Sequence, residues 1–377
     1  MTLTILADDL TGACDTGALF ARGAVVPVTV WPAGPPTGAV RVIDTESRSL
    51  DDRAAADRVR HAAAMTPALR YFKKIDSTLR GRIAAEVGAL MDGTGSAGAL
   101  LCPAFPAQRR TVRDRLLLVD GTPVTETPVA RDPQFPRATS SDIVEIVRSQ
   151  LRGLDDATAR WPAPGWISLS DVRAGAAAVS AHLQRLAGAI VVADAETDAD
   201  LGTLVDAVLS LPRCLILAGS AGLAGALARG LDRFAETVPV PPALRWLILV
   251  GSRHPASRRQ IEPARRAGLT VLATNDQDVT PAPDAACRVA EAAKGLLRRE
   301  GFDMIAATGG ETAVALYREL GARRIDLAGA PGPGLALGRL CASDFGDPWI
   351  ITKAGGFGDP DLYATLAAQS RERAEGD

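Results

Sequence analysis

The chain has 377 residues, of which 47% are hydrophobic, 23% are charged and 4% are aromatic, and its formal net charge at pH 7 is −2. This length predicts two domains, and the composition is typical of a soluble globular protein with a large core. The nearly balanced charge argues against a surface that binds nucleic acid or another polyanion. The scarcity of aromatic residues argues against stacking platforms for single-stranded nucleic acid.

The cysteines and the apolar runs indicate the compartment. Five cysteines are scattered along the chain without a CxxC pair, which is typical of free thiols in a reducing environment. The first apolar run follows Met1 directly, so we predict no signal segment. No apolar run reaches the roughly 18 residues that span a membrane. We therefore expect a cytoplasmic protein with neither membrane nor nucleic-acid partners.

Strand-like and helix-like segments alternate along the chain, which predicts a mostly parallel α/β architecture. The strands expected in the first half are 3–7, 25–30, 40–44, 71–75, 99–102, 166–169, 190–193 and 214–218. The helices expected between them include 13–22, 52–64, 79–91, 141–151, 172–186 and 221–229. A segment rich in threonine and proline, 120–136, predicts an irregular excursion or lid.

A cluster of prolines at 237–242 interrupts the alternation and predicts a linker. We therefore predict an N-terminal domain over 1–236, a linker over 237–245 and a C-terminal domain over 246–377. Each domain is expected to be a mostly parallel sheet flanked by helices, with the active site in the cleft between them. The C-terminal domain is expected to hold a helix at 313–320 and strands at 246–250, 270–273, 304–307, 325–328 and 349–352.

The most informative segment is ILADDLTGACD at 5–15, in which two carboxylates end the first strand and a helical stretch follows. Open α/β sheets bind their ligands at such strand ends. Asp8 and Asp9 are therefore candidates to bind sugar hydroxyls, a metal ion or both. The structural alternative is that Asp9 caps the helix.

A second charged segment, KKIDSTLRG at 73–81, again joins an expected strand to an expected helix. Its polar side chains suit a pocket for a hydroxylated anion: Lys73, Lys74, Asp76, Ser77 and Arg80. The alternative is that Asp76 or Ser77 caps the helix. Arg48, shortly after the strand 40–44, offers another guanidinium. In a parallel sheet all these strand ends open on the same edge.

Lysine is rare in this chain. Only four of the 42 basic residues are lysines: Lys73, Lys74, Lys294 and Lys353. We interpret lysines kept in an arginine-rich chain as positions that need a compact ammonium rather than a planar guanidinium. Lys294 lies in a polar helical stretch and is expected on the surface, whereas the other three fall within motifs.

Glycines follow several of the strands expected in the second half, in GSR at 251–253, TGGET at 308–312, PGPG at 331–334 and KAGGFG at 353–358. Glycines at the amino end of a helix let backbone amides approach phosphate oxygens closely, although any tight turn can use them. Together these segments predict a nucleotide cradle, in which Lys353 suits a phosphate charge.

Several motifs are missing from the sequence. It has no GxxxxGK[ST] loop, no HRD or DFG set and no strand–GxGxxG fingerprint for a dinucleotide. Its three histidines do not stand at metal-ligand spacing, so we predict no protein metal site. We expect His254 to be an exposed loop residue.

These segments resemble the motifs of the four-carbon acid sugar kinases, bacterial enzymes that phosphorylate threonate, erythronate or their oxo derivatives. The matching segments follow one another over nearly the whole chain: ADDLTGACDTG, TESRS, KKIDSTLRG, CPAFPAQRRTV, DGTPVTETPVARDP, GSRHPASRRQ, ATGGETA, PGPG and TKAGGFGDPDLY. The resemblance implies an N-terminal domain that binds the sugar acid and a C-terminal domain that binds ATP. Departures at Arg82, Gln108, Arg109 and Ala354 bear on the choice of substrate.

The resemblance also implies the residues of each site. The sugar-acid site would consist of Asp8, Asp9, Arg48, Lys74, Asp76, Ser77 and Arg80. The nucleotide would contact Ser252, Gly309, Gly310, Glu311, Thr312, Gly355 and Gly356, to which the glycine-rich pattern adds Lys353.

For the reaction, we expect catalysis to depend on Asp9, Asp76 and Arg80. Arg48, Lys74 and Arg80 would hold the substrate carboxylate, and one of Asp8, Asp9 or Asp76 would accept the proton of the terminal hydroxyl, with Asp9 preferred. Mg²⁺ would bridge the phosphates with few direct protein ligands. Closure of the two domains about the linker would exclude water.

Two alternatives from other classes stay open at this point. One is a sensor that binds a nucleotide or metabolite without turnover. The other is an NAD-dependent oxidoreductase, which the missing dinucleotide fingerprint disfavours. The assembly is also open, with a homodimer among the choices.

Overall fold

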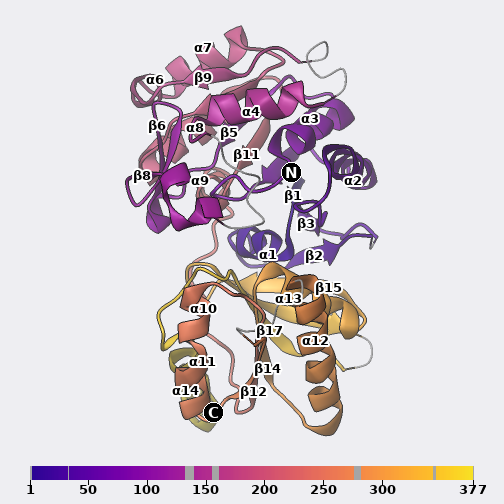
Figure 1. Cartoon of the computed structure of the whole chain (residues 1–377). Helices are drawn as coiled ribbons and strands as arrows, with labels where there is room; N and C mark the ends of the chain where they lie inside the picture. The colour runs from indigo at the N-terminus through magenta and orange to yellow at the C-terminus, as the bar shows by residue number, and fades with distance from the viewer. Residues whose placement is uncertain are drawn as a thin grey trace. The chain divides into compact units, whose positions relative to one another are not determined.

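The computed structural model describes residues 2–32, 34–131, 140–154, 161–275, 282–342 and 345–376. The chain divides into two compact units, each with its own strands and helices (Figure 1). The first unit is Met1–Asp9 with Thr37–Phe234, and the second is Leu10–Pro36 with Ala235–Asp377. The sequence predicts domains that are continuous along the chain, whereas residues 10–36 belong here to the second unit.

The strands of the first unit lie in the order β3-β1-β4-β11-β5-β10-β9, and all their pairs are parallel. Ala7 lies opposite both Asp44 and Lys74, and Gly219 also lies opposite Lys74. The carboxyl ends of these neighbouring strands therefore meet at one edge, as the sequence predicts. The strands are β1 (Leu3–Ala7), β3 (Val40–Asp44), β4 (Arg70–Lys74), β5 (Ala99–Cys102), β9 (Gly165–Ile167), β10 (Ile190–Ala193) and β11 (Ile216–Gly219).

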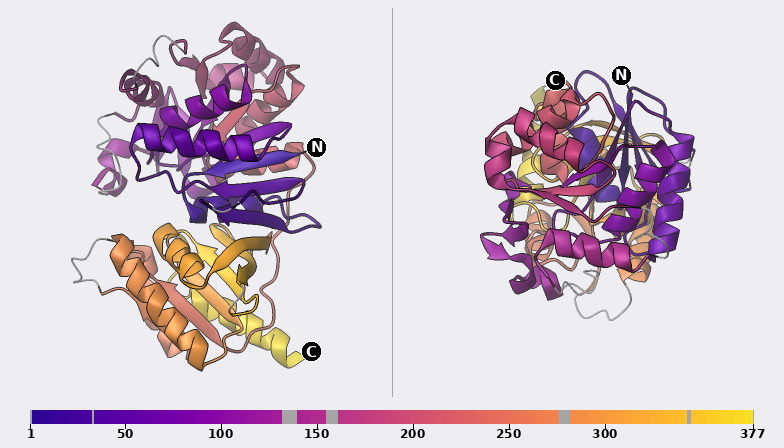
Figure 2. Two further views of the ribbon diagram at one scale, coloured as in Figure 1. Left: turned by 90° about the vertical axis from the view of Figure 1, so that its right-hand side faces the viewer. Right: turned by 90° about the horizontal axis from the view of Figure 1, so that it is seen from above.

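Helices cover the sheet of the first unit, and Figure 2 shows α2 and α3 side by side over one of its faces. Polar caps fix several of the helix starts: the Asp51 carboxylate accepts from the amide of Ala54, and Thr197 forms a capping box with Asp200. The helices are α2 (Asp52–Met65), α3 (Ile83–Thr94), α4 (Ile143–Arg152), α6 (Leu169–Arg173), α7 (Ala176–Arg185), α8 (Asp198–Ser210) and α9 (Ala221–Gly230).

Two predicted helices of the first unit differ in the structure. The helix predicted over 79–91 begins only at Ile83, because Leu79 and Gly81 take left-handed φ values of 66° and 101°. The helix predicted over 172–186 is divided into α6 and α7 by Gly175, whose φ is 105°. Left-handed residues cannot continue a right-handed helix, so both differences have the same cause.

A small antiparallel sheet lies just before the segment 120–136, which was predicted to be irregular, and its last strand falls within that segment. It consists of β6 (Arg110–Arg113), β7 (Leu116–Val119) and β8 (Thr122–Pro123). The 3₁₀ turns η1 (Pro106–Gln108), η2 (Val124–Glu126) and η3 (Pro128–Arg131) flank it. The remainder of the predicted lid, over 132–136, lies outside the described residues.

The strands of the second unit lie in the order β13-β12-β14-β17-β16-β15-β2. The first four are parallel to one another, whereas β16 runs antiparallel to β15 and β17, and β2 runs antiparallel to β15. Strand β16 is absent from the elements predicted above. The strands are β2 (Val26–Val30), β12 (Trp246–Val250), β13 (Thr270–Ala273), β14 (Met304–Thr308), β15 (Ala322–Gly329), β16 (Leu335–Ala342) and β17 (Trp349–Lys353).

The helices of the second unit lie on both faces of its sheet (Figure 1), with α10, α11 and α14 on one side and α12 and α13 on the other. Helix α1 packs against α13, β2 and β15. It begins directly after Asp9, so Thr11 and Gly12 lie within the helix rather than before it, and the predicted range 13–22 is wrong at both ends. The helices are α1 (Leu10–Ala18), α10 (Pro255–Arg259), α11 (Ile261–Arg266), α12 (Ala282–Arg299), α13 (Gly310–Glu319) and α14 (Leu362–Gly376).

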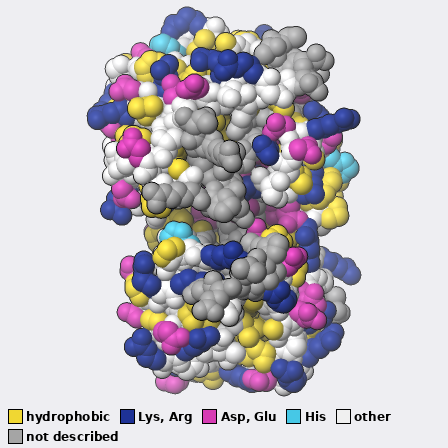
Figure 3. All heavy atoms as spheres, in the orientation of Figure 1, with side chains coloured by type: hydrophobic (Ala, Val, Ile, Leu, Met, Phe, Trp, Pro, Cys, Tyr) yellow, Lys and Arg dark blue, Asp and Glu magenta, His cyan; other side chains and the backbone are white. Residues whose placement is uncertain are grey.

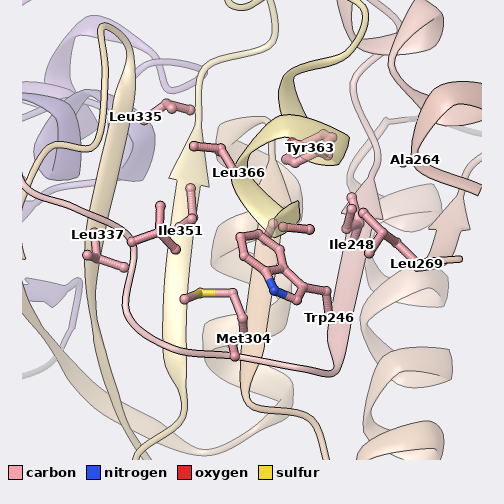
Figure 4. Close-up of a cluster of buried hydrophobic side chains, with 14 of the residues drawn as sticks. Trp246, Ile248, Ala264, Leu269, Met304, Leu335, Leu337, Ile351, Tyr363 and Leu366 are labelled. Atoms are coloured by element: carbon pink, nitrogen blue, oxygen red, sulfur yellow. The ribbon is translucent and has the colours of Figure 1, made fainter. Parts of the chain in front are cut away.

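The core of the second unit forms around Trp246, which is 2% exposed. Figure 4 shows its ring among Ile351, Met304 and Tyr363, which come from β17, β14 and α14. This apolar cluster fixes the strands whose ends carry the glycine segments. On the face drawn in Figure 3, acidic and basic side chains are interspersed. Among the described residues no helix is both long and apolar enough to cross a membrane.

Candidate active site

One arginine holds the two carboxylates at the end of β1. Arg48 donates to Asp8 from Nε at 2.8 Å and from Nη2 at 2.9 Å. It also donates to Asp9 from Nη1 at 3.0 Å and from Nη2 at 2.8 Å. Both oxygens of both carboxylates therefore accept from a single guanidinium, which is the fork geometry that arginine offers.

Burial and charge act in opposite directions on this group. Burial alone would raise the pKa of Asp8, but Arg48, Lys73 and Lys74 hold that pKa below its usual value. Burial would lower the pKa of Arg48, but the carboxylates of Asp8 and Asp9 raise it well above its usual value. Asp8 and Arg48 are therefore both ionised at neutral pH.

The loop after β4 forms a second ion pair. Asp76 accepts from Arg80 Nε at 3.0 Å and Nη2 at 2.8 Å, and from the amide of Thr78 at 3.1 Å. Burial would raise the pKa of Asp76, but Arg80 and Arg48 hold it well below its usual value. Asp76 thus stabilises a left-handed loop and does not cap α3, and Arg80 lies in that loop, before the start of α3 at Ile83. Ser77 is half-buried between these residues.

The two lysines of β4 have different surroundings. Lys73 is fully buried and pairs with Glu86 of α3 at 3.1 Å. Glu86 also accepts from the hydroxyl of Ser47. Lys74 is 6% exposed, and within the described parts of the chain its ammonium has no hydrogen-bond or carboxylate partner. A buried ammonium in this state can accept an anionic ligand.

Gly81 explains why this loop packs tightly on the acidic pair. Its φ is 101°, and a Cβ there would lie 3.1 Å from Asp8 Oδ2 and 3.7 Å from Arg48 Cγ. A side chain would therefore both strain the backbone and press on the carboxylate. All the residues predicted for the sugar-acid site thus lie on three neighbouring strand ends of the first unit.

In the second unit, three parallel strands end in register. Val250 lies opposite Thr308, and Thr308 lies opposite Lys353, so the segments that follow β12, β14 and β17 start side by side. Gly309 has a φ of 98° and directly precedes α13, and its amide donates to the carbonyl of Lys353 at 2.9 Å. The first amides of α13 therefore open at this edge.

Close approaches between these segments require glycine. A Cβ on Gly251 would lie 2.0 Å from Thr312 Oγ1, and one on Gly355 would lie 2.3 Å from Ser252 Oγ. The structure thus brings together the residues that the sequence predicts for nucleotide contacts: Ser252, Gly309, Gly310, Glu311, Thr312, Gly355 and Gly356. The PGPG segment forms the turn between β15 and β16 and lies beside the loop after β17. The amide of Ala354 donates to the carbonyl of Gly334 at 3.3 Å, and a Cβ on Gly334 would lie 2.1 Å from Phe357 Cδ1.

Lys353 is fully buried, and its ammonium is directed at the protein itself. It donates to the carbonyl of Phe357 at 2.9 Å, to that of Ala354 at 3.1 Å and to Ser257 Oγ at 3.4 Å. Burial lowers the pKa of Lys353 to about 7. The sequence predicts that Lys353 binds a phosphate. In the structure its ammonium instead donates to the backbone of the loop after β17.

Sequence reasoning missed the roles of three residues near these sites. His254 caps α10, since its Nδ1 accepts from the amide of Ala256 at 3.1 Å. Glu86 gives a weak sequence signal, being one acidic residue in the otherwise apolar run IAAEVGALM. Arg110 lies in the CPAFPAQRRTV motif, where no feature of the pattern distinguishes it from Arg109. Within the described ranges no group of three His, Cys, Asp or Glu residues is arranged to hold a metal ion.

Comparisons with known proteins match the chain to two domain models, the first of which includes residues 10–36. Residues 3–227 match the family model described as a sugar-binding N-terminal domain, and residues 276–363 match that of a nucleotide-binding C-terminal domain. A Haemophilus influenzae structure, 20% identical, has a TM-score of 0.73 and covers 98% of this chain and 100% of its own. A Bordetella bronchiseptica structure with bound citrate, a domain-swapped dimer, is 29% identical over 98% and 99% of the two chains, with a TM-score of 0.52.

Curated relatives align with nearly the full length of the chain. The D-threonate kinase of Bordetella bronchiseptica is 33% identical over 98% of this chain and 97% of the relative. The D-erythronate kinase of Heliobacterium modesticaldum is 28% identical over 96% and 95%. The 3-oxo-tetronate kinase of Pseudomonas fluorescens is 27% identical over 97% and 96%. With its motifs, both domain models and these relatives in agreement, the chain belongs to the four-carbon acid sugar kinase family.

Proposed function

We propose that this protein is an ATP-dependent kinase that transfers a phosphoryl group to a hydroxyl of a four-carbon sugar acid. One observation carries the proposal: charged side chains occupy the strand ends of one unit, and glycine segments occupy those of the other. The first arrangement suits a polyhydroxy anion, and the second suits phosphates. Relatives that are named as kinases and align with the whole chain support this pairing.

D-Threonate is the first candidate substrate. The relatives named as D-threonate kinases are 33%, 31% and 32% identical to this chain. Those named for D-erythronate or 3-oxo-tetronate are 26% to 28% identical. The difference is small, so the test must include all three acids. We propose the terminal hydroxyl as the attacking group.

In this reaction the first unit would orient the acid. Lys74 supplies a buried positive charge for the substrate carboxylate. Arg48 and Arg80 instead use their N–H groups on Asp8, Asp9 and Asp76. They therefore fix the carboxylates that contact the substrate hydroxyls. Since phosphoryl transfer depends mainly on positioning and electrostatic stabilisation, this rigid network is suited to it.

Asp9 remains our preferred general base. Asp8 and Asp76 have pKa values held below the usual value, which makes them weaker proton acceptors. The side chain of Asp9 is 19% exposed, against 2% for Asp8, so it is the more accessible carboxylate of the pair. A positioned base contributes about 10²- to 10⁴-fold in rate.

The second unit would bind the nucleotide through backbone amides. The amides that open α13 after Gly309, and those of Gly355 and Gly356, can donate to phosphate oxygens. Lys353 would act through the loop that it holds rather than by direct contact. Carboxylates that already accept from Arg48 are poor metal ligands, so the described residues do not form a dedicated Mg²⁺ cage. The ion that accompanies ATP would take its ligands from phosphate and water.

The experiment is a coupled measurement of ADP release with Mg²⁺ and ATP across D- and L-threonate, D- and L-erythronate, their oxo forms and longer aldonates. We expect one four-carbon acid to stimulate release strongly. Asp9→Asn should lose about 10²-fold or more in kcat while it binds ATP normally by calorimetry. If no four-carbon acid stimulates release while ATP still binds to the wild type, the proposal is wrong.

A further inference from the structure

Arg110 is a half-buried arginine of the first unit whose guanidinium is incompletely bonded. Its Nη1 donates to the carbonyl of Gln108 at 2.6 Å. Its Nε is enclosed and has no hydrogen-bond partner in the described part of the chain. A buried N–H group without an acceptor destabilises the folded protein. The fold retains this group although nothing in the described protein satisfies it.

The backbone holds Arg110 in place. The amide of Phe105 donates to the Arg110 carbonyl at 2.8 Å, and the amide of Arg110 donates to the Phe105 carbonyl at 3.1 Å. Phe105 lies three residues beyond the end of β5, at the edge where the acid-binding strand ends open. The backbone of Arg110 is therefore tied to the segment that follows β5 rather than to a free loop.

Arg110 lies within electrostatic range of the second ion pair. Burial lowers the pKa of Arg110, and the neighbouring Arg109 and Arg80 add to that effect, while Asp76 and Asp120 oppose it. Asp76 is already bonded to Arg80 and Thr78, and it forms no ion pair with Arg110 in the described structure. Arg110 thus lies close enough to Asp76 for their charges to interact, and no ion pair among the described residues neutralises it.

A charge balance separates the cations of the site into two kinds. Arg48 is committed to Asp8 and Asp9, and Arg80 is committed to Asp76. Over the described ranges, Lys74 and Arg110 have no carboxylate partner within salt-bridge distance. In Arg110 the bonded atom is Nη1, which leaves the Nε and Nη2 edge, the pair of parallel N–H groups that binds a carboxylate in bidentate fashion.

We propose that Arg110 binds the substrate carboxylate through its Nε and Nη2 edge, together with Lys74, and thereby selects acids over neutral polyols. The inference rests on the proposed function for the identity of the ligand. It reassigns the carboxylate from Arg48 and Arg80, which the sequence suggested, to the two cations that the protein leaves unneutralised.

The test compares Arg110→Met with Arg110→Lys and with Arg113→Met as a matched control. Arg113 lies on the same strand β6, its side chain is 57% exposed, and it pairs with Glu196 at 3.0 Å. For the acid that stimulates ADP release, Arg110→Met should raise KM about tenfold to a hundredfold. Arg110→Lys should recover part of the loss. Arg113→Met should match the wild type, and KM for ATP should stay constant in all three.

A second readout separates binding from a structural role. Without ligand, Arg110→Met should melt at or above the wild-type temperature, because it removes an unsatisfied buried group. D-Threonate and D-erythronate should raise the melting temperature of the wild type but not of Arg110→Met, and the neutral amides of these acids should behave alike in both. A wild-type KM and thermal shift in Arg110→Met would overturn the inference, as would equal losses for acid, amide and ATP.

The two proposals can fail separately. If the wild type releases no ADP with any acid, the kinase assignment fails. The thermal shift by the acids still tests the role of Arg110 in that case, since the shift needs no turnover. If ADP release is normal but Arg110→Met behaves as the wild type in both readouts, only the inference on Arg110 fails.

Discussion

At the residue scale, the main feature of the site is that its arginines are paired with its carboxylates. Arg48 donates to both Asp8 and Asp9, and Arg80 donates to Asp76. Removing either arginine would leave buried carboxylates unpaired, which is more damaging than the pair itself is stabilising. Among the described residues, the cations left for an anionic ligand are therefore those outside these pairs, Lys74 and Arg110.

Lys74→Arg tests the idea that this position needs a compact ammonium. The side chain is 6% exposed, so the larger guanidinium cannot take the same place without displacing its neighbours. We expect kcat/KM for the acid to fall about tenfold or more, with the charge retained. The control is Lys294→Arg, a partly exposed lysine paired with Glu319, which should match the wild type. Wild-type kinetics in Lys74→Arg would contradict this role.

Gly81→Ala tests the contact between the loop after β4 and the acidic pair. A methyl group at φ 101° would lie 3.1 Å from Asp8 Oδ2, so we expect both lower stability and a kcat/KM about tenfold to a hundredfold lower. Gly95→Ala is the matched control, because Gly95 has a φ of 63° and nothing within 4 Å of its Cβ position. It should lose stability in urea unfolding without losing activity. Equal activity in the two variants would refute the contact's importance.

The sequence predicted part of this residue-level arrangement. Asp8, Arg48 and Asp76 follow three strands that were expected to be parallel, and parallel ends meet at one edge, so their proximity was predictable. The pairing of Arg48 with two carboxylates was not, because it depends on the conformations of separate loops. Arg110 could not be found by pattern, since its importance comes from a missing bond partner rather than from its neighbours in sequence.

At the element scale, strands were predicted better than helix boundaries. β1, β3, β5, β10, β12 and β13 have the predicted bounds, because each is a short apolar run of the kind that parallel sheets bury between helices. Helix starts failed where left-handed residues intervene, as at Leu79 and Gly175. Strand β16 was missed because the PGPG turn and Gly338 hide its pattern, and its pairing with β15 is a property of the folded sheet.

Lys353→Met tests how the glycine loop is held. The pKa of Lys353 is about 7 in the folded protein, below the usual value, so between about pH 7 and pH 10 the unfolded chain binds more protons. Folding stability therefore rises with pH across this window. The wild type should gain up to about 1.4 kcal/mol per pH unit over the variant.

The measurement is urea unfolding of both proteins at pH 6, 7.5 and 9. Other groups that titrate in this range are shared, so they cancel in the difference between wild type and variant. Lys294→Met, which removes a partly exposed lysine, should show no pH-dependent difference. A gap between Lys353→Met and the wild type that stays constant with pH would show that the buried group does not titrate in this window.

At the scale of the whole molecule, the second unit is discontinuous in sequence. Strand β2 pairs with β15, and the amide of Ala235 donates to the carbonyl of Leu19 at 2.8 Å. A fragment of residues 235–377 would therefore lack a strand and the helix α1 from its own fold. We expect it to aggregate or to unfold without cooperativity.

Joining residues 10–36 to residues 235–377 through a flexible linker should restore a cooperative transition and ATP binding. Circular dichroism melting and calorimetry compare the two fragments. If residues 235–377 alone melt cooperatively and bind ATP as the fused fragment does, residues 10–36 are not required for the stability of this unit. The chain passes from one unit to the other after residues 9, 36 and 234. The sequence could not reveal this division, because the prolines near residue 240 mark only the last of these positions.

The most direct test of the central claim is the chemical identity of the product. The protein is incubated with ATP, Mg²⁺ and the acid that stimulates ADP release, and the mixture is analysed by ³¹P NMR and mass spectrometry. We predict one new phosphate monoester, coupled to the protons of a terminal CH₂ group and formed in equal amount to ADP. Inorganic phosphate alone, with the acid unchanged, would contradict the proposed phosphoryl transfer.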